Sequence, residues 1–128
     1  MKKRLAIAAS IILGLMFVFA SGMYFLKLGP KPNFPVGSPI AHFMAAFGPT
    51  GYLDFVKTFE LTGGILVMFP RTRNFGLLLL GPVIINIIAF HTFITRGHGL
   101  LNPMLDIIMV CALYLFWDAR KQFAALLK

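Results

Sequence analysis

The sequence predicts an all-α fold: a transmembrane four-helix bundle with a short interfacial or re-entrant helix in the first external loop. Composition is the first reason, because 59% of the residues are hydrophobic and only 12% are charged, against about 25% charged in soluble domains. Length is the second reason, because a span takes about 20 residues and the 128 residues hold four such stretches with short loops. We therefore expect a single transmembrane domain over residues 1–128.

The first expected helix covers approximately residues 5–26, an apolar run interrupted only by Ser10, Ser21 and Tyr24. The basic residues before it and the sequence VFA at 18–20 are also features of a cleavable secretory signal. The run is longer than the about 7 to 15 apolar residues of an ordinary signal core. We expect the span to be retained, with cleavage as the alternative.

Residues 29–51 predict an external loop, because they contain five prolines, which break regular structure. Within this loop, residues 40–47 (IAHFMAAF) are apolar but too short to cross a bilayer. We expect them to form a short helix that lies at the membrane interface or re-enters the bundle, where it would cover a cavity.

Two further spans are expected on either side of a tight turn. A helix over approximately 52–69 ends at Pro70, and Asn74 is the expected N-cap of a helix over approximately 74–95. Pro82 falls inside this second helix, where proline removes a hydrogen bond and commonly kinks the axis. A kink there would open space in the following turns.

The last expected helix covers approximately residues 102–117. It begins with Asn102 as N-cap and Pro103 at the first helical position, which is a favoured start. Residues 118–128 alternate charged and apolar side chains, so we expect an amphipathic tail on the inner face of the membrane.

The net charge is +8, and most of the basic residues fall on one side of the predicted membrane. Positive charge gathers in cytoplasmic loops, so both termini are expected in the cytoplasm, with membrane lipids as partners. No nucleic-acid motif accompanies the basic residues, so nucleic acid is not an expected partner. The residues on the side of the termini are Lys2, Lys3, Arg4, Arg71, Arg73, Arg120, Lys121 and Lys128, and those on the other side are Lys27, Lys31 and Arg96.

Several classes of site are excluded by residue type and spacing. Cys111 is the single cysteine, so thiol exchange within one chain is excluded. His42, His91 and His98 lie on different segments without HxxxH or ExxH spacing, so no metal or haem site is expected. No phosphate-binding loop or serine–histidine–acid set is present, and whether the chain is an enzyme stays open.

Lys57 and Glu60 are the leading candidates for a ligand-binding site. An ionisable side chain near the bilayer midplane costs roughly 2.5 kcal/mol or more, so it usually faces a bundle interior, a partner or a cavity. The two residues are three positions apart and share one helix face with Gly64. The pair predicts either a polar pocket that binds a carbonyl or an anion, or an ion pair that fixes packing, with Gly63 and Gly64 allowing close helix approach.

Asn86, His91 and Asp106 complete the candidate ligand-binding residues. Asn86 is either a ligand contact or an interhelical hydrogen bond, and His91 is either a ligand or proton carrier or an interfacial side chain that bonds Thr95 or the loop. Five positions on a helix place Asn86 and His91 about 140° apart, so without a kink at most one would point at a common centre. Asp106 lies near a helix start, where the dipole favours a carboxylate, and would meet Lys57 across the bundle.

The order of these features resembles the DoxX-like family over essentially the whole chain. The most specific part is GYLDFVKTFELTGGILVMFPRTRNFGLLLLGPVIINIIAFHTFI, and SGMYFLKL resembles the family's exit from the first helix. The resemblance implies a small four-helix protein of the bacterial inner membrane, with some relatives linked to quinone-dependent thiosulfate oxidation or to membrane redox complexes. It also implies that Lys57, Glu60, Asn86 and His91 form one shared site.

The residues and the resemblance together predict an accessory subunit that binds a quinone or another lipophilic small molecule at an outward-facing intramembrane polar site. No covalently bound cofactor is expected, and any redox step would need a membrane redox partner. A homo-oligomer is the other expected association. Two alternatives stay open: a structural or assembly subunit of a membrane complex, and a small proton-coupled transporter in which Glu60 titrates.

Overall fold

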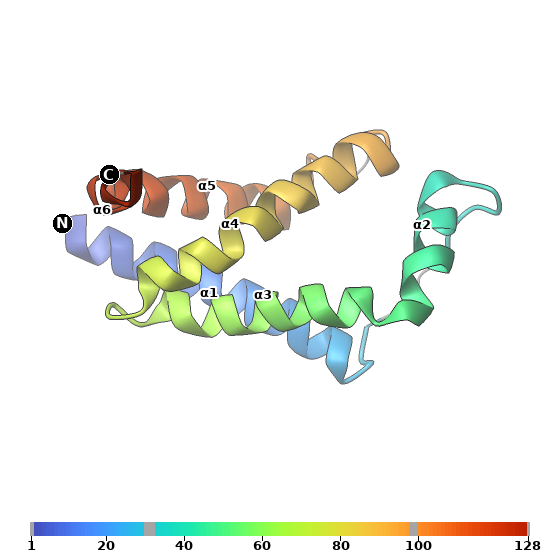
Figure 1. The fold of residues 1–128 in the computed structure, drawn as a ribbon, viewed down its shortest axis with the longest axis horizontal. Coiled ribbons are helices and arrows are strands. Elements are labelled where there is room, and N and C mark those ends of the chain that lie inside the picture. The colour runs from blue at the N-terminus through green and yellow to red at the C-terminus, as the bar shows by residue number, and fades with distance from the viewer. Residues whose placement is uncertain (1, 30–32, 98–99, 128) are drawn as a thin grey trace.

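The structure is a computed structural model that describes residues 2–29, 33–97 and 100–127, and these residues contain helices and no strand (Figure 1). The predicted all-α class is therefore confirmed for the described part of the chain. The long helices are α1 (Lys2–Phe25), α3 (Tyr52–Met68), α4 (Arg73–Ala89) and α5 (Pro103–Asp118). The shorter elements are α2 (Pro39–Phe47), the 3-10 turn η1 (Gly48–Thr50), the π-helical turn η2 (Phe90–Ile94), α6 (Arg120–Ala124) and the 3-10 turn η3 (Ala125–Leu127).

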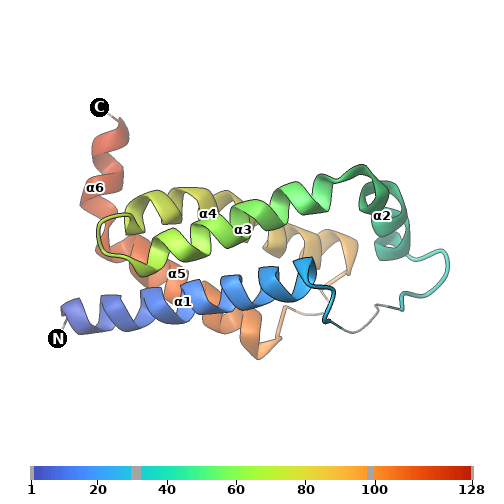
Figure 2. The same cartoon turned by 90° about the horizontal axis from the view of Figure 1, so that it is seen from below.

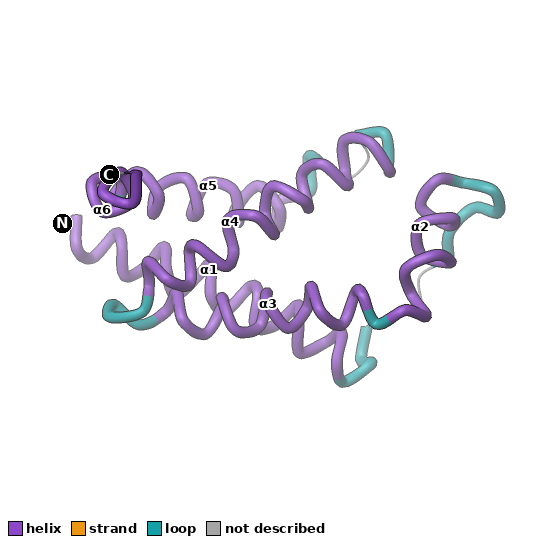
Figure 3. The backbone as a smooth tube through the Cα atoms, viewed as in Figure 1, coloured by secondary structure: helices purple, strands orange, loops and turns teal. Residues whose placement is uncertain are grey.

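The long helices pack lengthwise in an order that differs from their order in the chain. α1 contacts both α3 and α5, whereas α4 contacts α3 closely and α5 only weakly. This places α3 and α5 on a diagonal, with α1 between them. The start of α1, the turn between α3 and α4, and α6 lie at one end of the molecule, and α2 lies at the other (Figures 1 and 2). The turn between α3 and α4 lies at the first end, and the loops that follow α1, flank α2 and lead into α5 lie toward the other (Figure 3).

Two helix starts carry side-chain caps, of which the cap of α5 by Asn102 was predicted and the cap of α2 was not. α2 begins after Ser38, whose side chain accepts a hydrogen bond from the Ala41 N–H at 3.2 Å. α5 begins after Asn102, whose side chain accepts a hydrogen bond from the Met104 N–H at 2.9 Å, and Pro103 is the first helical residue. Each cap satisfies one of the backbone donors that a helix start leaves without an intrahelical partner.

The start and the end of α4 differ from the prediction. Thr72 is the N-cap residue, so the assignment of Asn74 to this role was wrong. The Thr72 side chain accepts no hydrogen bond from the first turn of α4. Its hydroxyl donates a hydrogen bond to the Leu66 carbonyl at 2.7 Å, which holds the turn closed. α4 continues through Pro82 to Ala89, and the chain then widens into η2, where the Thr95 N–H donates to the Phe90 carbonyl at 3.2 Å.

The adjacent glycines of α3 face different neighbours. Gly63 lies against α4, where a Cβ would come within 2.7 Å of the Leu80 side chain, and Gly64 lies against α1. Gly76 of α4 faces α3 in the same contact, since a Cβ on Gly76 would lie 2.6 Å from the backbone nitrogen of Val67. Small residues at both crossings let α3 approach two helices at once.

Two helical stretches, Lys3–Phe25 and Arg73–Ile94, are long and apolar enough to cross a membrane. α3 and α5 contain 17 and 16 residues, which at about 1.5 Å per residue falls short of the about 30 Å of a bilayer hydrocarbon core. Most of the buried interior between the helices is one apolar cluster, beside which Ser10, Ser21 and Glu60 are also buried. The cluster consists of Ala6, Leu13, Phe17, Val67, Leu77, Leu80, Ile84, Ile108, Cys111, Ala112 and Leu115.

Candidate functional site

The ion pair of α3 is the centre of the candidate site. Lys57 Nζ lies 3.0 Å from Glu60 Oε2, and the side chains are 27% and 5% exposed. The spacing of three residues brings the two groups to one face of the helix. A buried carboxylate is strongly disfavoured unless it is paired, so the contact with Lys57 is what stabilises the buried, charged Glu60 side chain.

A cavity of about 170 Å³ opens beside this pair, between α2, α3, α4 and η2. Its polar side chains are Lys57, Glu60, Asn86 and His91, together with Tyr52. Four of the five residues that the sequence singled out as ligand-binding therefore line one space. The remaining wall is apolar and consists of Phe43, Met44, Leu53, Val56, Ile87 and Phe90.

Asn86 and His91 both line this cavity, and between them the α-helix α4 gives way to the wider π-helical turn η2. α4 ends at Ala89, and η2 follows with hydrogen bonds that reach five residues back. A π turn holds more residues per turn than an α-helix, so the angle between successive side chains is smaller, and such turns are frequent at functional sites. Asn86 is exposed at the margin of the cavity, whereas His91 is half-buried, consistent with two different parts of the wall.

Asp106 does not join the site. It lies in the first turn of α5 and is not among the residues that line the cavity. The expected meeting with Lys57 is absent from the described structure, in which Lys57 pairs with Glu60. The reason is the helix order, because α5 packs on α1 and stands diagonally opposite α3.

An aromatic chain holds α2 over the cavity. The Phe43 ring of α2 lies 5.1 Å from the Phe90 ring of η2, and the Phe47 ring lies 5.1 Å from the Tyr52 ring at the start of α3. Phe43 and Phe47 also contact each other, with centroids 4.8 Å apart. Ring pairs at such separations contribute about 0.5–1.5 kcal/mol each beyond their burial. The short apolar segment of the first loop thus acts as a cover.

Tyr24 is a neighbour of the ion pair that the sequence did not connect with it. Its hydroxyl donates a hydrogen bond to Asp54 Oδ1 at 2.7 Å and ties the end of α1 to the start of α3. Lys57 Nζ lies 5.7 Å from the centre of the same ring, within the range of a cation–π interaction. The ring therefore shields one side of the lysine.

A groove of about 370 Å³ adjoins the cavity on the outer side of α3 and α4. Tyr52, Val56 and Asn86 line both spaces, so the two meet at these residues. Apart from them, the lining is apolar: Phe55, Phe59, Leu78, Leu79, Pro82 and Val83. The cavity with the polar side chains and a largely apolar groove thus adjoin.

Two residues that line the cavity were not predicted, although the helical spacing indicated them. Val56 and Tyr52 lie four and eight positions before Glu60, which places them on the same face of a helix. The apolar segment 40–47 was expected to cover a cavity, but which of its side chains line the cavity was not predicted, because only the fold brings Phe43 and Phe90 to α3.

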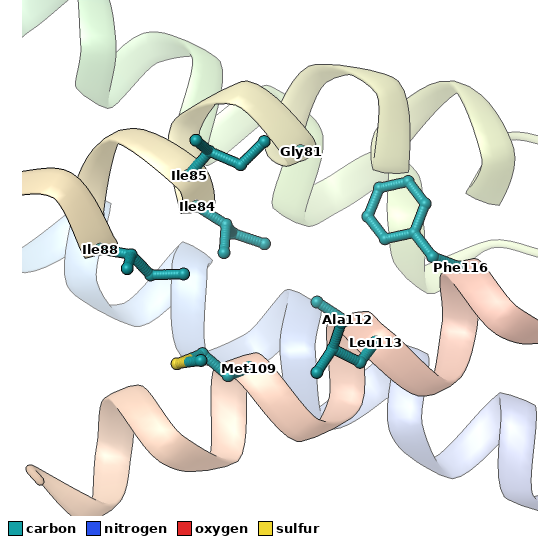
Figure 4. Close-up of a pocket in the computed structure, with 8 residues that line it drawn as sticks. All are labelled: Gly81, Ile84, Ile85, Ile88, Met109, Ala112, Leu113 and Phe116. Carbon is teal, nitrogen blue, oxygen red and sulfur yellow. The ribbon is translucent and has the colours of Figure 1, made fainter. Parts of the chain in front are cut away.

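A separate apolar cleft of about 350 Å³ lies between α4 and α5, where these helices pack weakly (Figure 4). Figure 4 shows side chains from both helices that border it. It is lined by Gly81, Ile84, Ile85, Ile88, Met109, Ala112, Leu113 and Phe116. None of these side chains offers a hydrogen bond from a nitrogen or oxygen, so the cleft provides shape and apolar contact alone.

Metal-ligating side chains do not gather among the described residues. No group of three or more His, Cys, Asp or Glu side chains lies close enough to hold an ion there. His42 is exposed on α2, His91 lines the cavity, and His98 lies outside the described residues. Cys111 is a buried free thiol in the core.

Comparison with known proteins adds one similarity. No family model matches the chain, and no solved structure matches it. The chain is similar to a protein of Bacillus subtilis (strain 168) described as "Uncharacterized protein YwoB", with 27% identity over 77 residues. The aligned region is 60% of this chain and 48% of that protein, so the chain spans about half the length of this curated relative. A similarity of this extent does not assign the chain to a family.

Proposed function

We propose that this chain is a DoxX-like protein of the bacterial inner membrane that binds a quinone or another lipophilic small molecule in the cavity beside Lys57 and Glu60. The observation that carries the proposal is the convergence of Lys57, Glu60, Asn86 and His91 on one covered space. Intramembrane ionisable groups mark functional sites by default. The resemblance to the DoxX-like family supports the same four residues.

The membrane placement rests on the outer surface of the helices. Soluble monomers rarely expose large contiguous apolar patches, yet each long helix here exposes large apolar side chains along its outer face. Two of the helical stretches have the length and composition of spans, and in the proposal α3 and α5 cross beside them as a four-helix transmembrane bundle. The exposed side chains include Ile11, Leu15 and Phe19 of α1, Phe55 and Ile65 of α3, Leu78 and Ile85 of α4, and Val110 and Leu113 of α5.

The orientation follows from the basic residues. The turn between α3 and α4, which contains Arg71, and the start of α4 at Arg73 lie at the same end as the start of α1 and as α6 (Figure 1). Because positive charge is retained on the cytoplasmic side, this end faces the cytoplasm in the proposal. The cavity under α2 then opens toward the outer face of the membrane.

The size of the cavity favours a small polar head with an apolar tail. At about 170 Å³, it lies below the about 300–1,000 Å³ of a pocket that encloses a whole drug-sized ligand. It suits one ring, and the adjoining apolar groove of about 370 Å³ suits a tail that continues into the lipid. This combination is the shape of a quinone.

Each of the four candidate side chains has a role in this proposal. Lys57 polarises a carbonyl oxygen of the ligand, and Glu60 keeps the lysine charged and relays protons. Asn86 and His91 donate hydrogen bonds to the ring oxygens. Electrons would pass to or from a membrane redox partner or a diffusible carrier, because the sequence has no motif for binding iron or flavin. An accessory subunit fits these roles.

The ion pair itself argues against a purely structural subunit. Both partners belong to α3, so the pair does not bond one helix to another as a packing clamp would. A proton-coupled transporter remains the other alternative, since Glu60 would titrate during transport. Substrate-dependent proton flux in liposomes would favour that alternative, and its absence would remove it.

The test is identification of lipophilic molecules that co-purify with the protein. Wild type, the double variant Lys57→Met/Glu60→Leu and the control Thr62→Val, at an exposed position of the same helix, are purified in detergent, extracted and analysed by mass spectrometry. A defined compound present in wild type and control and absent from the double variant supports the proposal. Bulk lipid alone in all three, with unchanged stability, contradicts it and favours the structural subunit.

A further inference from the structure

A second polar cavity lies at the opposite end of the molecule from α2. Its volume is about 390 Å³, and it is bounded by α1, the turn between α3 and α4, and the end of α5. The lining residues are Lys3, Ala6, Ile7, Pro70, Arg73 and Asp118. None of them belongs to the candidate site beside Lys57.

Arg73 has hydrogen-bond donors in this region that the protein does not satisfy. Its Nε and Nη2 atoms are buried and have no hydrogen-bond partner. A guanidinium is always charged and carries five N–H donors in a rigid fork. A buried donor without an acceptor is costly, so the position of this side chain points to an acceptor that comes from outside the chain.

The one carboxylate of the cavity does not supply that acceptor. Asp118 is exposed at the end of α5, and no ion pair within 4.0 Å joins it to Arg73 or Lys3 in the described structure. The nearby Arg120 is engaged elsewhere, since it lies over the Trp117 ring at 4.2 Å and donates to the Trp117 carbonyl at 2.8 Å. Two cations thus face one carboxylate, and the cavity keeps a net positive charge.

We infer that this cavity binds a phosphate-bearing anion, and that the anion is the phosphodiester headgroup of an anionic lipid. The fork of Arg73 matches two phosphate oxygens, and Lys3 adds a second positive charge. α4 starts at this point without a side-chain cap, so the positive end of its dipole adds to the attraction.

The position of the cavity favours a lipid headgroup over free phosphate as the bound anion. Lys3 and Arg73 are the first residues of the two stretches that are long and apolar enough to cross a membrane. A cavity at the start of both spans lies at headgroup depth, where basic pockets between helices recognise anionic lipids. Ala6, Ile7 and Pro70 add an apolar wall that suits a lipid backbone. This lipid assignment rests on the proposed membrane placement, whereas the anion site itself does not.

The experiment counts bound lipids by native mass spectrometry on the full chain. Detergent-solubilised protein is titrated with phosphatidylglycerol or, as the neutral reference, phosphatidylcholine. Wild type is expected to retain phosphatidylglycerol preferentially, and Arg73→Gln is expected to weaken its binding about tenfold or more, as for the loss of a hydrogen bond to a charged group. Arg71→Gln removes the same charge from an exposed position of the same turn and is expected to change the affinity less than about twofold.

Equal binding by the two arginine variants, or equal binding of the two lipids by wild type, would overturn the inference. Lys3→Gln tests the same cavity from an exposed position of α1, so the inference stays testable if Arg73→Gln fails to fold. Thermal unfolding with and without inorganic phosphate is the second arm, and stabilisation by phosphate equal to that by phosphatidylglycerol would overturn the lipid assignment. The molecule identified beside Lys57 is unaffected by either result, so the two proposals can fail separately.

Discussion

Gly14 of α1 and Gly64 of α3 meet backbone to backbone. A Cβ placed on Gly14 would lie 2.5 Å from the Gly64 carbonyl oxygen, and a Cβ placed on Gly64 would lie 3.1 Å from the Gly14 carbonyl oxygen. A backbone atom cannot move aside as the end of a flexible side chain can. The crossing of these two helices therefore depends on the absence of a side chain at both positions.

Gly14→Ala is expected to lower stability by about 1–3 kcal/mol, the usual effect of overpacking. Gly22→Ala is the matched control, because it lies in the same helix and a Cβ there would meet nothing within 4 Å. It is expected to be neutral or to stabilise by up to about 1 kcal/mol through helix propensity. Thermal unfolding in detergent, followed by circular dichroism, compares the two. Equal unfolding midpoints for the two variants would show that α1 and α3 can move apart at this crossing without loss of stability.

Lys57→Met is expected to destabilise more than the double variant Lys57→Met/Glu60→Leu. The single change leaves the Glu60 carboxylate buried without a partner, and breaking a buried pair costs about 3–5 kcal/mol. Partial exposure of Lys57 places the expected loss near the lower limit. The double change removes both charges and is expected to lie within about 1 kcal/mol of wild type. Denaturant unfolding measures both, and a less stable double variant would contradict the argument.

The hydrogen bond from Tyr24 to Asp54 is expected to show coupling in a double-mutant cycle of Tyr24→Phe and Asp54→Ala. A hydrogen bond to a charged group contributes about 1.5–3 kcal/mol, and the exposed position of this bond favours a coupling energy at or below the lower limit. Additive losses from the two single variants would show that α1 and α3 do not depend on this contact.

Asn102→Ala is expected to cost about 1 kcal/mol, because Asn102 caps α5 with a side-chain hydrogen bond. Asn74→Ala is the contrasting change. α4 starts before Asn74, so this side chain is not its cap, and little loss is expected. If both changes cost the same, the N-cap assigned to α4 here would be wrong.

The sequence predicted where each helix begins and ends better than it predicted which helices pack against one another. Hydropathy and caps located the four long helices within a few residues, and helical spacing placed Lys57 and Glu60 on one face. The position of Asp106 depended on which helices lie side by side, and chain order does not determine that. The family resemblance implied one site for Asn86 and His91, whereas regular helical spacing separates them by about 140°, and the widening of the helix at Phe90–Ile94 was not predicted from the sequence.

The pairing of Lys57 with Glu60 inside one helix also bears on how the chain is made. Such a pair forms as soon as its own segment becomes helical, before any neighbour arrives. A carboxylate whose counter-ion belonged to a later helix would have to enter the bilayer alone and wait for synthesis of its partner. In the proposed four-helix transmembrane bundle, Glu60 would bring its counter-ion with it, so α3 would be inserted as a unit in which these two charges already cancel.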